Sequence, residues 1–381
     1  MKMGVPGFVG GRLTQAREAM GLSQSRLAEQ LGMSKQAISR YESGADSPMQ
    51  ARFEELVDLL HQDHDFFLRP LRPLSNEVTF YRRLKKVRAS ELKKVAIKRE
   101  WYEEIVQLIA QYLELPKLNL PDLFIPHDPL MIDMEDIERS SLRVREHWGL
   151  GQRPIGNLVR QMERNGLVVS RFSFGVDNVD GFSVNIKDYS LSLVALNTVK
   201  SNAFRSRFDA AHELGHHILH QHVTAEMMSD PAIYELVERQ AHRFASSLLM
   251  PRDAFRDDIF TYKIEALLSI KEKWNVSLSA ILYRMKDMGL IDDDMHQDFR
   301  KTLNSKRWST REPLDDQLKP EKPALLAQAI ELLVKDAGFT KQDILDDLKL
   351  KPEVIVEIAE LEIDYFDKPE QHMIGLANLR L

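Results

Sequence analysis

The stretch RFDAAHELGHHILH, residues 207–220, decides how the central part of this chain folds. It reads as a helix and contains the pattern His-Glu-x-x-His, formed by His212, Glu213 and His216. Two histidines four residues apart lie on one helix face and can both bind one zinc ion, while the glutamate projects toward the same open side. The stretch therefore predicts a helix that carries two zinc ligands and a general base.

A third protein ligand is needed, because a catalytic zinc has about three and keeps one position for water. His220 lies about 12 Å along the helix axis from His212, whereas the ligand atoms of one zinc lie within about 4 Å of each other. A glutamate on the next helix is the better candidate. The segment SDPAIYELVERQAHRFASSLLMP, residues 229–251, predicts such a helix and offers both Glu235 and Glu238.

A second pattern lies near the start of the chain, in LTQAREAMGLSQSRLAEQLGMSKQAISRYESG, residues 13–44. Ser23 and Ser34 are typical caps of two successive helices separated by a glycine-containing turn. On the second helix the apolar positions share one face and the polar positions share the other. Long polar side chains on such a face suit base edges in a major groove; here they are Lys35, Gln36, Ser39 and Arg40.

This segment resembles the lambda-repressor/Cro-like (Xre) helix–turn–helix over about residues 10–70, including the trailing Tyr41-Glu42-Ser43-Gly44. The resemblance implies that the domain binds an operator in double-stranded DNA, usually as a homodimer on a palindrome. It also implies that Gln24 contacts the DNA backbone. Base reading is then assigned to Lys35, Gln36 and Arg40.

HELGHHILH followed by ERQAHRFASSLLMP resembles the ImmA/IrrE metallopeptidase family over about residues 135–290, with a zincin-like (thermolysin-like) arrangement. The resemblance implies that Glu238 is the third zinc ligand. His242 stands where asparagine is more usual and is expected to hydrogen-bond a metal-binding histidine. Asp209 replaces the expected threonine or serine. The segments FYRR from Phe80 and WGLG from Trp148 are similar to those of family members fused to an Xre domain.

The implied chemistry is peptide hydrolysis, in which zinc polarises the scissile carbonyl and Glu213 moves the proton of the attacking water. The strand that ends at Leu196 is expected to bind the substrate backbone as an added edge. The residue that stabilises the oxyanion is left open among four candidates, Tyr189, Arg205, Arg207 and His217. In characterised relatives the substrate is a repressor cleaved during stress or DNA damage.

Composition limits the remaining choices. The 381 residues include no cysteine, which excludes thiol chemistry and leaves only His and carboxylate ligands for a metal. The net charge of −6 hides an uneven distribution, since residues 1–120 carry 19 Lys/Arg and 15 Asp/Glu and the remainder carries −10. The net positive charge of residues 1–120 suits contact with the phosphates of DNA. No apolar run is long enough to span a membrane, so we expect a cytoplasmic protein with no membrane partner.

The expected fold class is mainly α with a small β-sheet (α+β). We expect a helix–turn–helix domain at 1–72, a basic helical connector with a Pro-rich linker at 73–130, the metallopeptidase domain at 131–295 and a helical domain at 296–381. Strands are predicted at 167–174, 181–184 and 191–196, and a helix from about 79 to 115. The last helical segment exposes acidic side chains, which indicates protein packing rather than DNA binding.

Two functions follow as alternatives. The first is a DNA-binding regulator that carries a zinc-dependent endopeptidase. The second is a transcription factor whose metallopeptidase-like domain is a non-catalytic sensor or dimerisation module. A weaker third hypothesis is an antitoxin-like or phage-defence regulator that acts through a partner.

Overall fold

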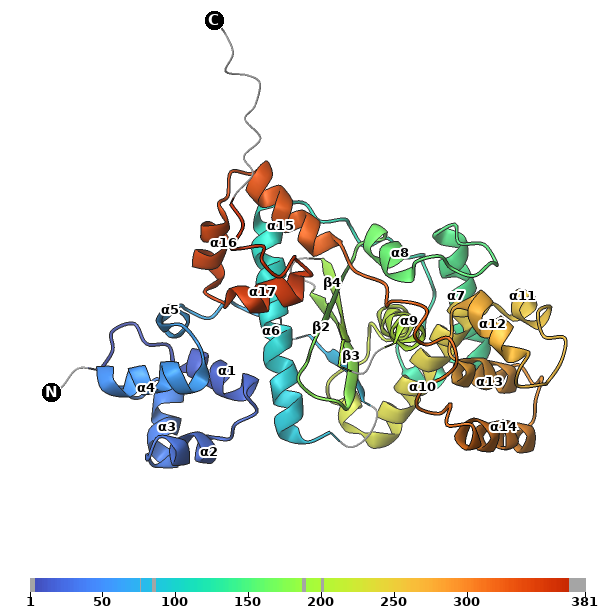
Figure 1. Ribbon diagram of the computed structural model, residues 1–381, viewed down its shortest axis with the longest axis horizontal. Helices are drawn as coiled ribbons and strands as arrows, with labels where there is room; N and C mark the ends of the chain where they lie inside the picture. Colours follow the sequence, from blue (N-terminus) through green and yellow to red (C-terminus); the bar gives the residue numbers. More distant parts are fainter. Residues whose placement is uncertain (1–3, 76, 84–86, 187–189, 200–201, 370–381) are drawn as a thin grey trace, which may run out of the picture.

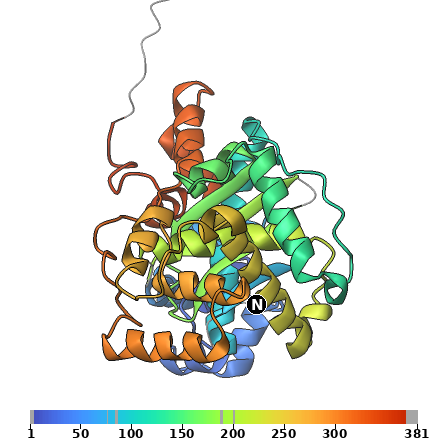
Figure 2. The same cartoon turned by 90° about the vertical axis from the view of Figure 1, so that its right-hand side faces the viewer.

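The computed structural model describes residues 4–75, 77–83, 87–186, 190–199 and 202–369. Three groups of elements are visible in Figure 1: a small helical domain at the amino terminus, a central sheet with its flanking helices, and a short helical group at the carboxyl end. Helices α11–α14 (residues 252–305) lie at the end of the molecule opposite the amino-terminal domain (Figure 1), and this end faces the viewer in Figure 2. No helix among the described residues is long and apolar enough to cross a membrane.

The helices up to residue 164 are α1 (Gly10–Ala19), α2 (Gln24–Gln30), α3 (Lys35–Glu42), α4 (Gln50–Leu60), α5 (His64–Leu68), α6 (Ala89–Tyr112), α7 (Met134–His147) and α8 (Leu158–Arg164), with the short 3₁₀ turn η1 (Pro129–Met131). Those after residue 202 are α9 (Ala203–Leu219), η3 (Met227–Ser229), α10 (Pro231–Leu249), α11 (Arg252–Arg256), α12 (Leu267–Trp274), α13 (Leu278–Asp287), α14 (Asp293–Ser305), α15 (Leu325–Lys335), α16 (Lys341–Leu348) and α17 (Pro352–Ala359). The α+β expectation is confirmed.

The sheet has four strands in the order β1-β3-β4-β2: β1 (Thr79–Arg83), β2 (Leu167–Phe172), β3 (Val179–Ile186) and β4 (Leu191–Asn197). β4 is parallel to β2 and antiparallel to β3, and β1 is antiparallel to β3. The three strands predicted from β-branched and aromatic runs are confirmed. The expectation of helix from residue 79 is wrong at its start, because residues 79–83 extend the sheet and the helix begins only at Ala89.

Long α6 connects the parts of the molecule (Figure 1). Its buried side chains include Trp101, which meets Phe66 of the amino-terminal domain edge to face, and Tyr102, whose hydroxyl donates to the Val168 carbonyl of β2. One helix thus packs against both the small domain and the sheet. Other apolar side chains of α6 are buried as well, whereas Tyr112 at its end is exposed.

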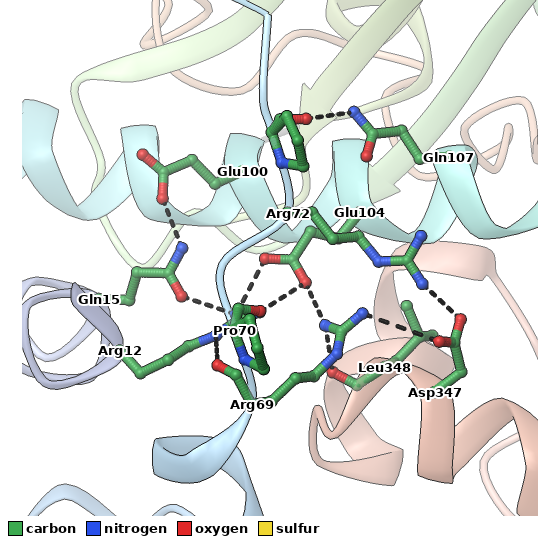
Figure 3. Close-up of polar contacts among 11 residues, drawn as sticks. Arg12, Gln15, Arg69, Pro70, Arg72, Glu100, Glu104, Gln107, Asp347 and Leu348 are labelled. Atoms are coloured by element: carbon green, nitrogen blue, oxygen red, sulfur yellow. Dashed lines mark hydrogen bonds and ion pairs between the residues drawn. The ribbon is translucent and has the colours of Figure 1, made fainter. Parts of the chain in front are cut away.

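A buried ion pair fixes the amino-terminal domain to α6. Arg12 of α1 donates to both carboxylate oxygens of Glu104 at 2.9 and 3.2 Å, and both side chains are fully buried. Arg69 donates to the same carboxylate at 2.6 Å and to the Leu348 carbonyl of α16. Figure 3 shows these groups converging from α1, the segment after α5, α6 and α16. Because burial removes the hydration of both charges, such a pair is favourable only when the two groups are in close contact. This contact therefore constrains how the amino-terminal domain is joined to α6.

The carboxy-terminal helices pack on the rest of the chain rather than standing free. The Ser170 hydroxyl of β2 donates to the Ile358 carbonyl of α17, and Glu357 accepts from the Ser173 amide at 2.8 Å. Lys98 of α6 pairs with the same glutamate at 3.4 Å. The acidic face that we interpreted as a packing surface makes such contacts here.

Candidate metal centre and nucleic-acid interface

The two longest helices after the sheet, α9 and α10, bring three potential metal ligands together. They cross closely at Gly215, where an added Cβ would lie 3.2 Å from the Ala241 backbone. Asp230 caps α10 and Pro231 occupies its first turn, as the sequence predicts. This packing places Glu238 of α10 against His212 and His216 of α9, while Glu235 is exposed to solvent.

The distances among these three side chains suit a tetrahedral zinc ion. His212 Nε2 lies 3.1 Å from His216 Nε2 and 3.4 Å from Glu238 Oε2, and His216 Nε2 lies 3.5 Å from Glu238 Oε1. Ligand atoms at about 2.0–2.2 Å from a tetrahedral zinc are separated by about 3.3–3.6 Å. The two distances to Glu238 fall in this range, and the distance between the histidines is slightly shorter. The three residues form the one group of three or more His, Asp or Glu side chains with ligand spacing in the described part of the chain.

The protonation states of His212 and Glu238 also suit metal binding. Burial, followed by the nearby charge of Arg82, lowers the pKa of His212 to about 3. Burial alone would raise the pKa of Glu238, but its hydrogen bonds with His212 and His216 lower it well below its usual value. Neutral imidazole and ionised carboxylate are the forms that bind metal. The buried Glu238 Oε1 lies at the long distance of 3.5 Å from its partner His216 Nε2, so a metal ion would satisfy this oxygen better.

Glu213 follows the ligand His212 on α9 and lies against β3 of the sheet. Its side chain is close to Gly181 of β3, where an added Cβ would lie 2.9 Å from Oε1. Burial raises its pKa well above the usual value, against the opposing effect of the Ser183 hydroxyl. A carboxyl with a raised pKa is suited to accept and return a proton. A side chain at position 181 would displace the Glu213 carboxylate, so glycine leaves this group its place.

The histidine that supports the ligands is His220, and not His242. His220 Nδ1 lies 2.9 Å from His216 Nδ1, and its Nε2 lies 3.1 Å from Gln240 Oε1. The expectation that His242 hydrogen-bonds a metal-binding histidine is not met at His212, whose Nδ1 is buried without a hydrogen-bond partner. His242 instead packs on Phe208 with ring centroids 4.7 Å apart. The sequence signal for this role is the spacing of His212, His216 and His220. His220 is too far from His212 to bind the same zinc ion, but it is well placed to orient the ligand His216.

Strand β1 contributes two side chains to this region that the motif alone does not reveal. The Phe80 ring stacks on the His216 ring at 4.6 Å, nearly parallel. Arg82 pairs with Asp209 of α9 at 2.5 Å and lies over the Phe208 ring. Burial raises the pKa of Asp209 to about 7 despite this neighbour. The aspartate that departs from the family pattern thus has a basic partner in the FYRR segment.

The expectations about substrate contacts need correction. β4, which ends at Asn197, cannot accept a peptide as an added edge because β3 and β2 pair with it on both sides. Arg207 donates to the Ile155 and Gly156 carbonyls and to Glu321, Arg205 to the Ser309 carbonyl, and His217 lies 2.7 Å from Asn185. Tyr189 lies outside the described residues.

The predicted DNA-reading surface is formed by α3. Ser34 accepts from the Ala37 amide and caps the helix, and Ser23 caps α2 in the same way. Ile38 is buried, while the proposed base-reading residues are exposed on the other face: Lys35, Gln36, Ser39 and Arg40. Arg40 pairs loosely with Asp46 at 3.5 Å, a contact of two exposed side chains that DNA can replace at little cost.

Gln24 stands at the start of α2 and is held by a buried cluster. Its Nε2 donates to Glu42 Oε2 at 2.7 Å, and Glu42 also pairs with Arg17 of α1 at 2.5 Å. This cluster ties the first three helices together. The side chain that the resemblance assigns to the DNA backbone therefore also has a structural partner in this conformation.

Comparison with protein-family models agrees with this architecture. Residues 162–286 match the M78 peptidase model, described as an IrrE N-terminal-like domain, and residues 13–67 match a helix–turn–helix model. No curated protein matches the chain in sequence. The chain joins an Xre-like helix–turn–helix DNA-binding domain to an IrrE/ImmA-like domain of a metallopeptidase family. This combination defines a regulator that contains a peptidase-family domain.

Proposed function

We propose that this protein is a DNA-binding transcriptional regulator whose peptidase-family domain is a zinc-dependent endopeptidase. The observation that carries the proposal is the grouping of His212, His216 and Glu238 at tetrahedral ligand distances, with Glu213 beside them. Zinc, when bound, supplies Lewis acidity that polarises a scissile carbonyl and lowers the pKa of a water. Glu213 takes the proton of the attacking water and delivers it to the leaving amine.

The substrate class that we propose is a protein segment in extended conformation, because Glu213 lies against β3, which is an edge strand within the region that matches the peptidase family. The family resemblance points to a repressor that is cleaved in a stress or DNA-damage response. For DNA we propose an operator bound by a homodimer, with Gln24 on the backbone and Lys35, Gln36 and Arg40 at base edges, supported by Ser34 as helix cap and Ser39 on the same face.

The test is incubation of the zinc-loaded protein with the repressor encoded beside it, followed by mass analysis of the fragments. Replacement Glu213→Gln removes the proton acceptor and keeps the shape of the side chain. We expect loss of cleavage with the zinc content unchanged. Undiminished cleavage by the variant would contradict the proposed role of Glu213.

One observation favours the alternative, a non-catalytic sensor or dimerisation module. The side chains of the site are almost entirely enclosed, with Glu213 at 0%, His216 at 1% and His212 at 2% exposure. A sensor would bind zinc without cleaving any protein. Zinc-dependent changes in operator affinity, in the absence of fragments from the repressor or from the chain itself, would favour this alternative.

A further inference from the structure

Strand β1 covers the candidate metal centre from outside the region that matches the peptidase family. The matched residues 162–286 contain β2, β3 and β4, in the spatial order β3-β4-β2. Within this region β3 is therefore an edge strand, and it lies against Glu213. Extended peptides bind to such edges through backbone hydrogen bonds. In this chain the edge is already occupied, because residues 79–83 pair with it in antiparallel orientation.

Alternate side chains of β1 point at the site. Phe80 stacks on His216 and Arg82 reaches Asp209, whereas Tyr81 between them packs with Phe182 of the sheet. Arg82 is the residue directly opposite Gly181, which touches Glu213. Side chains of a strand alternate between faces, so β1 presents every second residue to the ligands as a bound peptide would.

The surroundings of Phe80 and Arg82 differ in chemistry. Phe80 packs with Val223 and Val237, and a cavity of about 1430 Å³ continues beyond it past His220. At the other end, a cavity of about 250 Å³ has more acidic than basic side chains in its lining: Asp177, Asp180, Asp209 and Glu312 against Arg82 and Arg205. One position therefore suits an aromatic side chain, and the position two residues later suits a cation.

We propose that β1 is an internal occupant of the peptide groove, which closes the site until it is displaced by a substrate that carries an aromatic residue and, two positions later, a basic one. The inference rests on the proposed function and specifies its substrate class and regulation. It accounts for part of the burial of His216, because the Phe80 ring of the strand lies on the His216 ring. Tyr234 of α10 holds the strand from its other side by donating to the Tyr81 carbonyl at 3.2 Å.

The experiment measures binding, which does not depend on turnover. A fluorescent peptide with the sequence of residues 77–83, EVTFYRR, is titrated into zinc-loaded full-length protein that carries Glu213→Gln. The parent binds weakly because its groove is filled. Adding Arg82→Glu places a negative charge beside Asp209 and Asp180 and weakens β1, so we expect binding at least about tenfold tighter. Faster hydrogen exchange of residues 79–83 must accompany it.

Arg143→Glu is the matched control, since it makes the same charge change at an exposed site on α7 and must leave peptide affinity unchanged. Phe80→Ala is a second opening variant without a charge change, for use if Arg82→Glu does not fold. A peptide with serine in place of its phenylalanine must not bind. Unchanged affinity in a folded, zinc-containing opening variant overturns the inference. That result leaves the proposed function standing if protein that retains Glu213 cleaves the repressor, whereas peptide binding without cleavage by the Glu213 protein contradicts only the endopeptidase.

Discussion

Removal of the Glu138 charge should destabilise the peptidase-family domain in a pH-dependent way. Glu138 of α7 is buried and accepts from Arg284 of α13 and from Ser247 of α10 at 2.8 Å, and it pairs with Arg243 of α10 at 2.7 Å. Burial alone would raise the pKa of Glu138, but the hydrogen bonds and charges of these neighbours lower it to about 2. This carboxylate thus joins the helix that carries Glu238 to two others.

The size of the expected destabilisation follows from the lowered pKa of Glu138. A drop from the usual 4.5 to about 2 corresponds to roughly 3 kcal/mol of stability from the ionised form. A lowered pKa stabilises the fold above the pKa of the unfolded chain, so the contribution is fully present at pH 7. It declines as the pH falls from about 5 toward 2, and about half of it remains at pH 3.

The assay is urea unfolding of Glu138→Gln and of wild type between pH 7 and pH 3, followed by a probe in this domain. We expect a destabilisation of about 3 kcal/mol at pH 7 that shrinks by about 1–2 kcal/mol at pH 3. Glu135→Gln, an exposed site on the same helix, is the matched control and should change stability by less than about 0.5 kcal/mol. If the difference in unfolding free energy between Glu138→Gln and wild type did not depend on pH, or were below about 1 kcal/mol at pH 7, the Glu138 charge would not stabilise the fold as described.

Three further predictions concern the two sites. Arg40→Ala should weaken operator binding by about 5- to 150-fold in electrophoretic shift or anisotropy titrations, whereas Arg300→Ala on α14 should have no effect; equal losses would argue against α3 as the reading helix. Glu238→Gln should reduce bound zinc, measured by metal analysis, from about one ion per chain to near zero without changing operator affinity, and retention of stoichiometric zinc would exclude Glu238 as a ligand. His220→Ala should lower zinc affinity by about 10- to 100-fold in chelator competition because His216 loses its orienting partner, while Gln221→Ala should leave it unchanged.

The sequence predicts the local features of this molecule well. Caps such as Ser34 and Asp230, the apolar spacing of α6 and the branched runs of the strands depend on neighbours along the chain, and each forms the expected element. The grouping of His212, His216 and Glu238 follows from helix periodicity together with the family resemblance.

What failed depends on contacts between distant segments. Residues 79–83 have a basic, aromatic sequence next to a helical one, and only the edge of β3 determines that they form a strand. The sequence suggests β4 as an edge strand, because the order in which strands pair depends on other segments and cannot be deduced from the residues of one strand. His242 was assigned by analogy to asparagine, but its larger ring packs on Phe208 instead.

The candidate zinc site combines two histidines of α9 with one glutamate of α10. X-ray absorption at the zinc edge, on protein whose metal content has been measured, reports the ligands of a bound ion. We expect one zinc per chain with two imidazole nitrogens and the remaining ligands oxygen, at about 2.0–2.2 Å. A purified, folded protein that does not bind zinc, or one whose zinc has a different number of imidazole ligands, would contradict this expectation.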